Sequence, residues 1–141
     1  MVLIFTLFNN TILASILSGG AAALVSYCIN SRALKSKGEK VIIYWAPILE
    51  ELLKTGFALV LRSNVFLSHV TFGAVEAVYD IWAQDSITAY LAGLASFISH
   101  GVFGAITQHF IYQGHTFLGI ATAVLIHIAW NYVVIKMKNQ H

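Results

Sequence analysis

The sequence has few charged residues and a single cysteine. Only 10% of its 141 residues are charged and 58% are hydrophobic, whereas soluble domains carry about a quarter charged residues. Cys28 stands alone, which excludes a disulfide within the chain and a thiolate metal site built on a cysteine pair. The shortage of charge therefore indicates a membrane protein rather than a water-soluble domain.

Long stretches with little charge divide the sequence into membrane-spanning segments. No charged residue precedes Arg32. A helix needs about 20 mostly apolar residues to cross a bilayer, and five stretches meet this length: 11–29, 41–61, 65–83, 87–112 and 116–135. We expect an all-α fold, a polytopic membrane helix bundle with about five transmembrane helices, which forms one membrane domain over residues 1–141.

Lysine and arginine are concentrated on one predicted side of the membrane. Six of them lie between the first two segments or after the last one: Arg32, Lys35, Lys37, Lys40, Lys136 and Lys138. The opposite side has only Arg62. Because cytoplasmic loops are enriched in these residues, we expect an N-terminus outside and a C-terminus in the cytoplasm. We interpret the "KSKG" loop as a topology signal rather than a nucleic-acid site, so no nucleic-acid partner is expected.

Ionisable side chains lie deep within four of the predicted segments. Glu50, Glu76 and His127 each lie about 10–14 Å from the predicted cytoplasmic boundary, because a helix rises 1.5 Å per residue. Burying such groups in a bilayer is costly, and they commonly mark functional sites. The alternative is that each one only links helices by hydrogen bonds. The full set is Glu50, Glu51, Lys54, His69, Glu76, Asp80, His100, His109 and His127, with the amide of Asn131.

The residue types in this set suit hydrolysis. Two histidines and a carboxylate form a common zinc site, and a further carboxylate can accept a proton from water. A carboxylate can also activate water without a metal while His and Asn stabilise the oxyanion. The sequence lacks "HExxH", so both versions remain open. Pro47, one turn before Glu50, predicts a kink that opens the helix beside the glutamates.

Four motifs resemble those of a known family. "PILEELLK", "FGAVEAVY", "SHGVFGAITQHF" and "HIAWN" resemble the membrane motifs of the PrsW-type intramembrane proteases. These are related to the CAAX-processing and Abi proteases and to the non-proteolytic APH subunit of gamma-secretase. The resemblance covers residues 41–135 and leaves the first helix outside. Ala77 replaces the usual Asn of the second motif, and the CAAX-type "EExxxR" pattern is not met, so prenylated substrates are not expected.

The resemblance implies roles for individual residues. Glu50 would be the general base toward water, and Glu51 would orient Lys54. Glu76, His100 and His127 would hold a metal, with zinc as the expected cofactor. The implied catalytic residues are Glu50, Glu51, Glu76, His100, His127 and Asn131.

The predicted function is an intramembrane protease that hydrolyses a peptide bond of a membrane-bound protein substrate. The alternatives are a non-catalytic membrane scaffold subunit and a small transporter for protons or metal ions. The expected partners are the lipid bilayer and the substrate. The small residues Ser15, Gly19 and Ala23 form a stripe on the first helix, which suits either contacts within the chain or a homodimer.

Overall fold

The chain folds into long α-helices interrupted by one short π-helix. The computed structural model describes residues 2–84 and 86–138, and every regular element in those ranges is helical. These elements are α1 (Val2–Lys37), the π-helix η1 (Val41–Trp45), α2 (Ala46–Val60), α3 (Val65–Gln84), α4 (Ile87–Tyr112) and α5 (Thr116–Lys138). The all-α class is confirmed. The predicted segment 87–112 coincides with α4, whereas α1 extends beyond 11–29 at both ends and the segment 41–61 is divided into η1 and α2.

Three of the helices are long and apolar enough to cross a membrane: α1 over Asn10–Ser36, α4 over Ile87–Tyr112 and α5 over Thr116–Met137. The surface is more apolar than the interior. Large side chains such as Leu24, Ile87 and Phe117 are exposed, whereas the largest of the fully buried side chains is that of Lys54. Extensive apolar surface marks an interaction with another apolar phase. The chain is therefore best described as a membrane protein.

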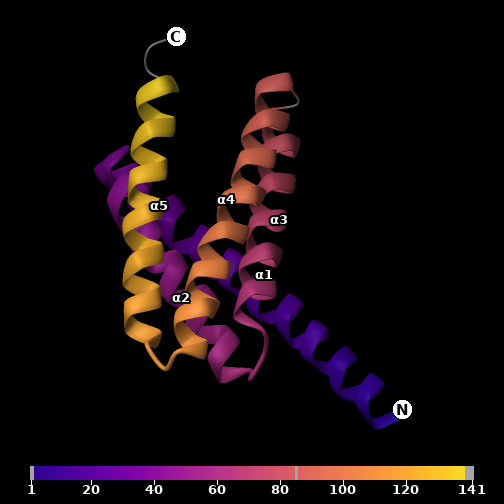
Figure 1. The fold of residues 1–141 in the computed structure, drawn as a ribbon. Helices are drawn as coiled ribbons and strands as arrows, with labels where there is room; N and C mark the ends of the chain where they lie inside the picture. Colours follow the sequence, from indigo (N-terminus) through magenta and orange to yellow (C-terminus); the bar gives the residue numbers. More distant parts are fainter. Residues whose placement is uncertain (1, 85, 139–141) are drawn as a thin grey trace.

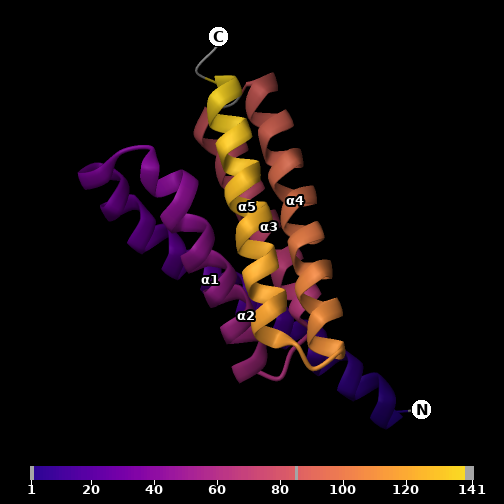
Figure 2. The same ribbon diagram turned by 60° about the vertical axis from the view of Figure 1, so that its left-hand side comes forward.

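The helices form an upright group with one oblique neighbour. α3, α4 and α5 stand side by side, while α1 crosses the group at a slant (Figures 1 and 2). The turns α2–α3 and α4–α5 lie at one end, and the turn α3–α4 lies at the other, together with the end of α5 (Figure 1). Successive helices thus alternate in direction, which brings side chains from the middle of several helices to a common level.

α3 and α4 approach each other through two matched pairs of glycine and histidine. A Cβ on Gly73 of α3 would lie 2.9 Å from the Cβ of His100 on α4, and a Cβ on Gly104 of α4 would lie 2.6 Å from the Cβ of His69 on α3. Both distances are too short for a real side chain. Each helix therefore has the pattern His-x-x-x-Gly, and each histidine lies over the glycine of the other helix. Small residues commonly permit such close approach between membrane helices.

The small residues of α1 lie against α3. A Cβ on Gly19 would come within 2.7 Å of the Thr71 Cβ and 3.1 Å of the Phe72 nitrogen. Ser15 is fully buried, and its hydroxyl accepts a hydrogen bond from the backbone N–H of Asn64 at 3.1 Å. The small-residue stripe, which suits either contacts within the chain or a homodimer, thus holds α1 against α3 within the chain.

The π-helix η1 ends two residues before Pro47. In the π register each N–H bonds the carbonyl five residues earlier, and the Ala46 N–H donates to the Val41 carbonyl in this way. The next carbonyl, that of Ile42, would need the N–H of Pro47, which has none. Instead the Asn131 side-chain amide on α5 donates to the Ile42 carbonyl at 2.9 Å. The disturbance predicted at Pro47 thus takes the form of a π turn whose unpaired acceptor is bonded by α5.

Candidate active site

Polar side chains from all five α-helices meet inside the bundle. The shared depth of Glu50, Glu76 and His127 predicts that they converge, and the structure brings them into one connected cluster. His69 of α3 and Asn30 of α1 join it. The members of this polar cluster are Asn30, Glu50, Glu51, Lys54, His69, Glu76, His100 and His127.

Lys54 links α2 to α4. Its ammonium donates to Glu51 Oε1 at 2.6 Å and to His100 Nδ1 at 2.9 Å. It also lies 4.4 Å from the centroid of the Phe72 ring, which provides a cation–π contact. The side chains of Lys54 and Glu51 are fully buried. A buried charge requires such pairing, and the predicted contact between Glu51 and Lys54 is present.

His100 has both ring nitrogens engaged. The Lys54 ammonium can only donate, so His100 Nδ1 accepts and the proton of the neutral ring lies on Nε2. Nε2 donates to Glu76 Oε2 at 2.6 Å, and the Ser96 hydroxyl donates to the same oxygen at 2.7 Å. Glu76 therefore fixes the orientation of the imidazole.

His127 faces both glutamates. Its Nδ1 donates to Glu51 Oε1 at 3.0 Å, because a carboxylate can only accept. In the neutral ring Nε2 then carries a lone pair, and this atom lies 3.9 Å from Glu50 Oε2. This separation is longer than a hydrogen bond. His127 Nε2 and Glu50 Oε2 are thus two acceptors that face each other. A small ligand that donates a hydrogen bond to each atom would bridge the gap between them.

His69 closes the other side of Glu51. It is fully buried, with Nδ1 3.5 Å from Glu51 Oε2 and Nε2 3.3 Å from the Thr55 hydroxyl. The sequence placed His69 deep in its segment but gave it no role. The pattern His-x-x-x-Gly occurs in both α3 and α4. Because the α4 copy contains His100, this shared pattern is the signal that could have assigned His69 to the site.

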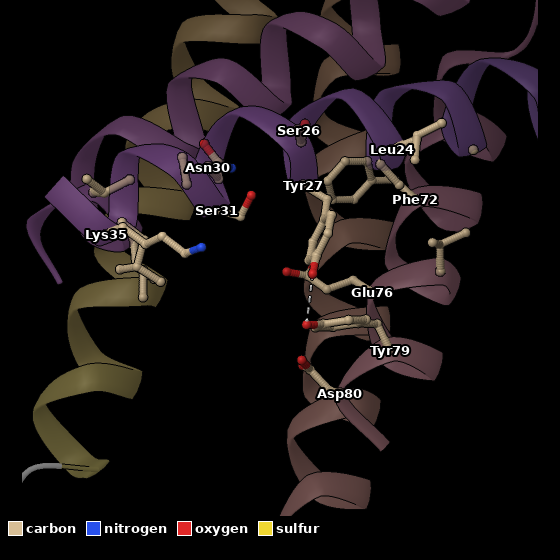
Figure 3. Close-up of a pocket in the computed structure, with 17 residues that line it drawn as sticks. Leu24, Ser26, Tyr27, Asn30, Ser31, Lys35, Phe72, Glu76, Tyr79 and Asp80 are labelled. Atoms are coloured by element: carbon tan, nitrogen blue, oxygen red, sulfur yellow. Dashed lines mark hydrogen bonds between the residues drawn. The ribbon is translucent and has the colours of Figure 1, made fainter. Parts of the chain in front are cut away.

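A cavity of about 500 Å³ lies between α1, η1 and α3. Glu50 is connected to it through Asn30, which donates to Glu50 Oε1 at 3.0 Å and lines the cavity together with Glu76. Asn30 and Glu76 project from opposite walls (Figure 3). The hydroxyls of Tyr27 and Tyr79, 3.3 Å apart, join α1 to α3 next to Glu76 (Figure 3). No feature of the sequence pointed to Asn30, because the resemblance excludes the first helix.

The donor set for a metal differs from the predicted one. Glu50, His100 and His127 each offer one ligand atom, and these atoms lie within 4.8 Å of one another. Glu76, the predicted carboxylate ligand, holds His100 Nε2 instead. Each of the three donors has an outer partner that orients it: Asn30 for Glu50, Glu76 for His100 and Glu51 for His127. Such partners are typical of metal-binding histidines, so Glu50 and His127 fit a zinc ion, and His100 fits once the Lys54 ammonium leaves its Nδ1.

Three of the residues considered in the sequence lie outside the polar cluster: Asp80, which lines the cavity, Asn131 and His109. Asn131, a predicted catalytic residue, is one turn from His127, but its amide bonds the Ile42 carbonyl. It therefore connects α5 to η1. His109 lies nearer the end of α4 and bonds the Gln113 side chain at 3.1 Å.

Comparisons with protein-family models, with curated proteins and with solved structures found no match. The function is therefore inferred from the side chains of the site.

Proposed function

We propose that the protein is an intramembrane protease that hydrolyses a peptide bond of a membrane-bound substrate. The observation that supports this most directly is the pair Glu50 and His127. Their acceptor atoms face each other 3.9 Å apart, both side chains are at most 10% exposed, and the hydrogen-bond partner of Glu50 lines a cavity of about 500 Å³. Ligand pockets commonly have this size.

The geometry suits activation of water by a carboxylate. A water molecule between Glu50 and His127 would donate one hydrogen to each acceptor. Glu50 takes a proton as the water oxygen attacks the substrate carbonyl, and passes it to the departing amine when the C–N bond breaks. The products are a carboxyl group and an amine. Glu51 holds the imidazole of His127 in the required orientation, because it accepts from Nδ1.

Zinc is the proposed cofactor. In this version of the site Glu50, His100 and His127 would hold the ion in place of the bridging water, Glu50 would be a ligand rather than the free base, and the ion would supply a Lewis acid for the substrate carbonyl. The polar cluster holds three carboxyl groups and one lysine, and a cation would offset carboxylate charge in a medium of low dielectric constant. Nε2 of His100 donates to Glu76 and Nδ1 accepts from Lys54, so His100 would bind the ion through Nδ1 only after the Lys54 ammonium has moved away.

The resemblance to PrsW-type proteases agrees with this proposal and suggests the topology. We propose that all five α-helices cross the membrane, with the N-terminus outside and the C-terminus in the cytoplasm. α2 and α3 would be the polar inner helices. The turn between α1 and η1 lies toward the same end of the bundle as the end of α5 (Figure 1), so most of the loop lysines and arginines gather on one side, as cytoplasmic loops do.

The proposal is tested with the purified chain in liposomes, by measuring cleavage of a single-span reporter and ion flux in parallel. Glu50→Gln keeps the shape of the side chain and should lower the cleavage rate by about 10²–10⁴-fold. His127→Ala should lower it by about 10²–10³-fold. The matched control is His109→Ala, which removes a histidine of α4 outside the polar cluster and should cleave like the parent chain.

The same assay separates the rival functions. Cleavage by a folded Glu50→Gln protein at the parent rate would contradict the assigned base. Ion flux that requires Glu50, without cleavage, would indicate a transporter. Neither activity in the folded parent chain would indicate a scaffold subunit.

A further inference from the structure

The α1 wall of the cavity carries a buried hydroxyl without a partner. Ser26 is 2% exposed and lines the cavity, yet its Oγ has no hydrogen-bond partner among the described residues. A serine within a helix can bond a carbonyl of the preceding turn. The other serines of α1 do so: Ser15, Ser18, Ser31 and Ser36. Ser26 is therefore an exception on its own helix, and the cavity is where its hydroxyl can find a partner.

A second unpaired atom lies one turn further along α1. Asn30 donates through Nδ2 to Glu50, but its Oδ1 is buried and has no hydrogen-bond partner among the described residues. Residues four apart share a helix face, with Cβ atoms about 5–6 Å apart. Ser26 and Asn30 therefore share a face of α1, and both line the cavity. Buried polar groups are normally bonded, so these two oxygen atoms are available to bond a group that enters the cavity.

We propose that Ser26 and Asn30 form a binding element for the peptide backbone of the substrate. An extended segment lies in the cavity along α1, where one of its N–H groups donates to Asn30 Oδ1 and one of its carbonyls accepts from the Ser26 hydroxyl. The segment carries apolar side chains. This inference rests on the proposed protease function and assigns the binding of its substrate to α1, the helix outside the family resemblance.

The chemistry of the cavity favours a peptide over a lipid. An acyl chain would leave both polar atoms unpaired. Glu76 and Asp80 line the α3 wall and Lys35 lines the α1 wall, so two carboxyl groups face one cation and disfavour an anionic head group. A peptide that unwinds within the bilayer, by contrast, exposes N–H and carbonyl groups that each cost several kcal/mol when unpaired.

The remaining wall of the cavity suits apolar side chains. Leu24, Phe72 and Val75 supply much of the surface. Asn30 also connects the binding element to the catalytic side chain, because the amide that would accept from the substrate through Oδ1 holds Glu50 through Nδ2. A substrate bonded to Asn30 therefore lies beside the carboxylate that activates water.

The first test is kinetic. With the single-span reporter in liposomes, Ser26→Ala should raise KM by about three- to tenfold, the usual range for one hydrogen bond within a membrane, while kcat stays within about twofold. Ser36→Ala removes a hydroxyl from the same helix outside the cavity and should leave both constants unchanged. Equal kinetics for Ser26→Ala and Ser36→Ala would overturn the proposal.

The second test needs no change at Ser26, so it stands even if that variant fails to fold. A photoreactive synthetic peptide of about 25 leucine and alanine residues, with a central glycine pair, is irradiated with the Glu50→Gln chain in lipid nanodiscs. Mass spectrometry should find the label on residues 24–31, and unlabelled peptide should compete while added phospholipid should not. Labelling confined to other helices, or displacement by phospholipid, would contradict the binding element.

The two tests also separate this inference from the proposed function. Labelling of residues 24–31 without cleavage by the parent chain would retain the binding element and contradict the protease. Cleavage by the parent chain without that labelling would do the reverse.

Discussion

Glu50 and Glu51 are adjacent in the sequence but lie in different surroundings. Glu51 is fully buried, where it accepts from Lys54 and His127 and faces His69. Glu50 accepts from Asn30, which lines the cavity. We call the first group, Glu51 with Lys54 and His69, the sealed side, and the second, Glu50 with Glu76 and Asn30, the open side.

The difference indicates a division of labour. On the sealed side, charge is balanced inside the protein, so its residues hold the helices and orient His127. On the open side, Glu76 is 38% exposed at its side chain and Asn30 retains an unpaired acceptor, so these residues can meet a substrate. The sealed side should therefore affect stability first, and the open side activity first.

The largest expected effect is that of Glu51→Gln. This variant leaves the buried Lys54 ammonium without its anionic partner, and breaking a buried ion pair costs about 3–5 kcal/mol of unfolding free energy. Thermal unfolding in detergent should show a large loss of stability. The double variant Glu51→Gln with Lys54→Met removes both charges and should recover much of it. If Glu51→Gln were as stable as the parent chain, the sealed side would have no structural role.

A smaller effect is expected from Glu76→Gln on the open side. The amide can still meet the His100 N–H, but it no longer supplies the negative charge that orients and polarises the ring. Loss of such an outer partner lowers metal affinity or activity by about 10–100-fold, while thermal stability should stay near that of the parent chain. Zinc content of the purified protein and reporter cleavage measure the two quantities. A loss of stability as large as that of Glu51→Gln would show that the open side contributes to stability as much as the sealed side does.

Gly104→Ala tests the packing of α4 against His69, a residue of the sealed side. The added Cβ would lie 2.6 Å from the His69 Cβ, so α3 and α4 must separate. Overpacking of this kind costs about 1–3 kcal/mol. Gly101→Ala is the matched control on the same helix, because its nearest neighbour, Val70 Cγ2, lies 3.9 Å from the added Cβ. Unfolding in detergent should distinguish the two variants, and equal stability would contradict the close contact of His69 with α4.

The smallest effect is expected for Asn131→Ala. The variant loses the hydrogen bond to the Ile42 carbonyl, and such bonds between membrane helices average about 0.6 kcal/mol. Cleavage should be weakened but measurable, since Asn131 supports the turn before the glutamates and lies outside the polar cluster. A fall in the cleavage rate as large as that of His127→Ala would instead place Asn131 at the reacting atoms.

The sequence predicted the helices well because their apolar runs are long. Charge-poor stretches located α3, α4 and α5 to within a few residues at each end, and the depth of Glu50, Glu76 and His127 predicted their convergence. The break at η1 could not be placed from the sequence, because the π turn depends on Asn131, 89 residues away from Ile42.

The detailed partners of the site were less predictable. Glu76 and Glu50 lie at similar depths, so depth alone could not decide which carboxylate joins the two histidines, and the structure selects Glu50. Asn30 lies near the end of the first apolar run, where an amide is unremarkable in sequence. Its role depends on the slant of α1, which results from contacts such as Gly19 against α3.

The π turn also has a consequence for how the chain tolerates changes in length. An i→i+5 turn holds one more residue than an α turn, and one residue rotates a helix by about 100°. If one residue of 41–45 is deleted, η1 can become α-helical. The resulting rotation then falls on the loop before η1 and leaves α2 in place. Asn131 of α5 bonds this turn, so α5 sets the direction in which Glu50 points. The segment before η1 can then rotate relative to α2 without turning Glu50 away.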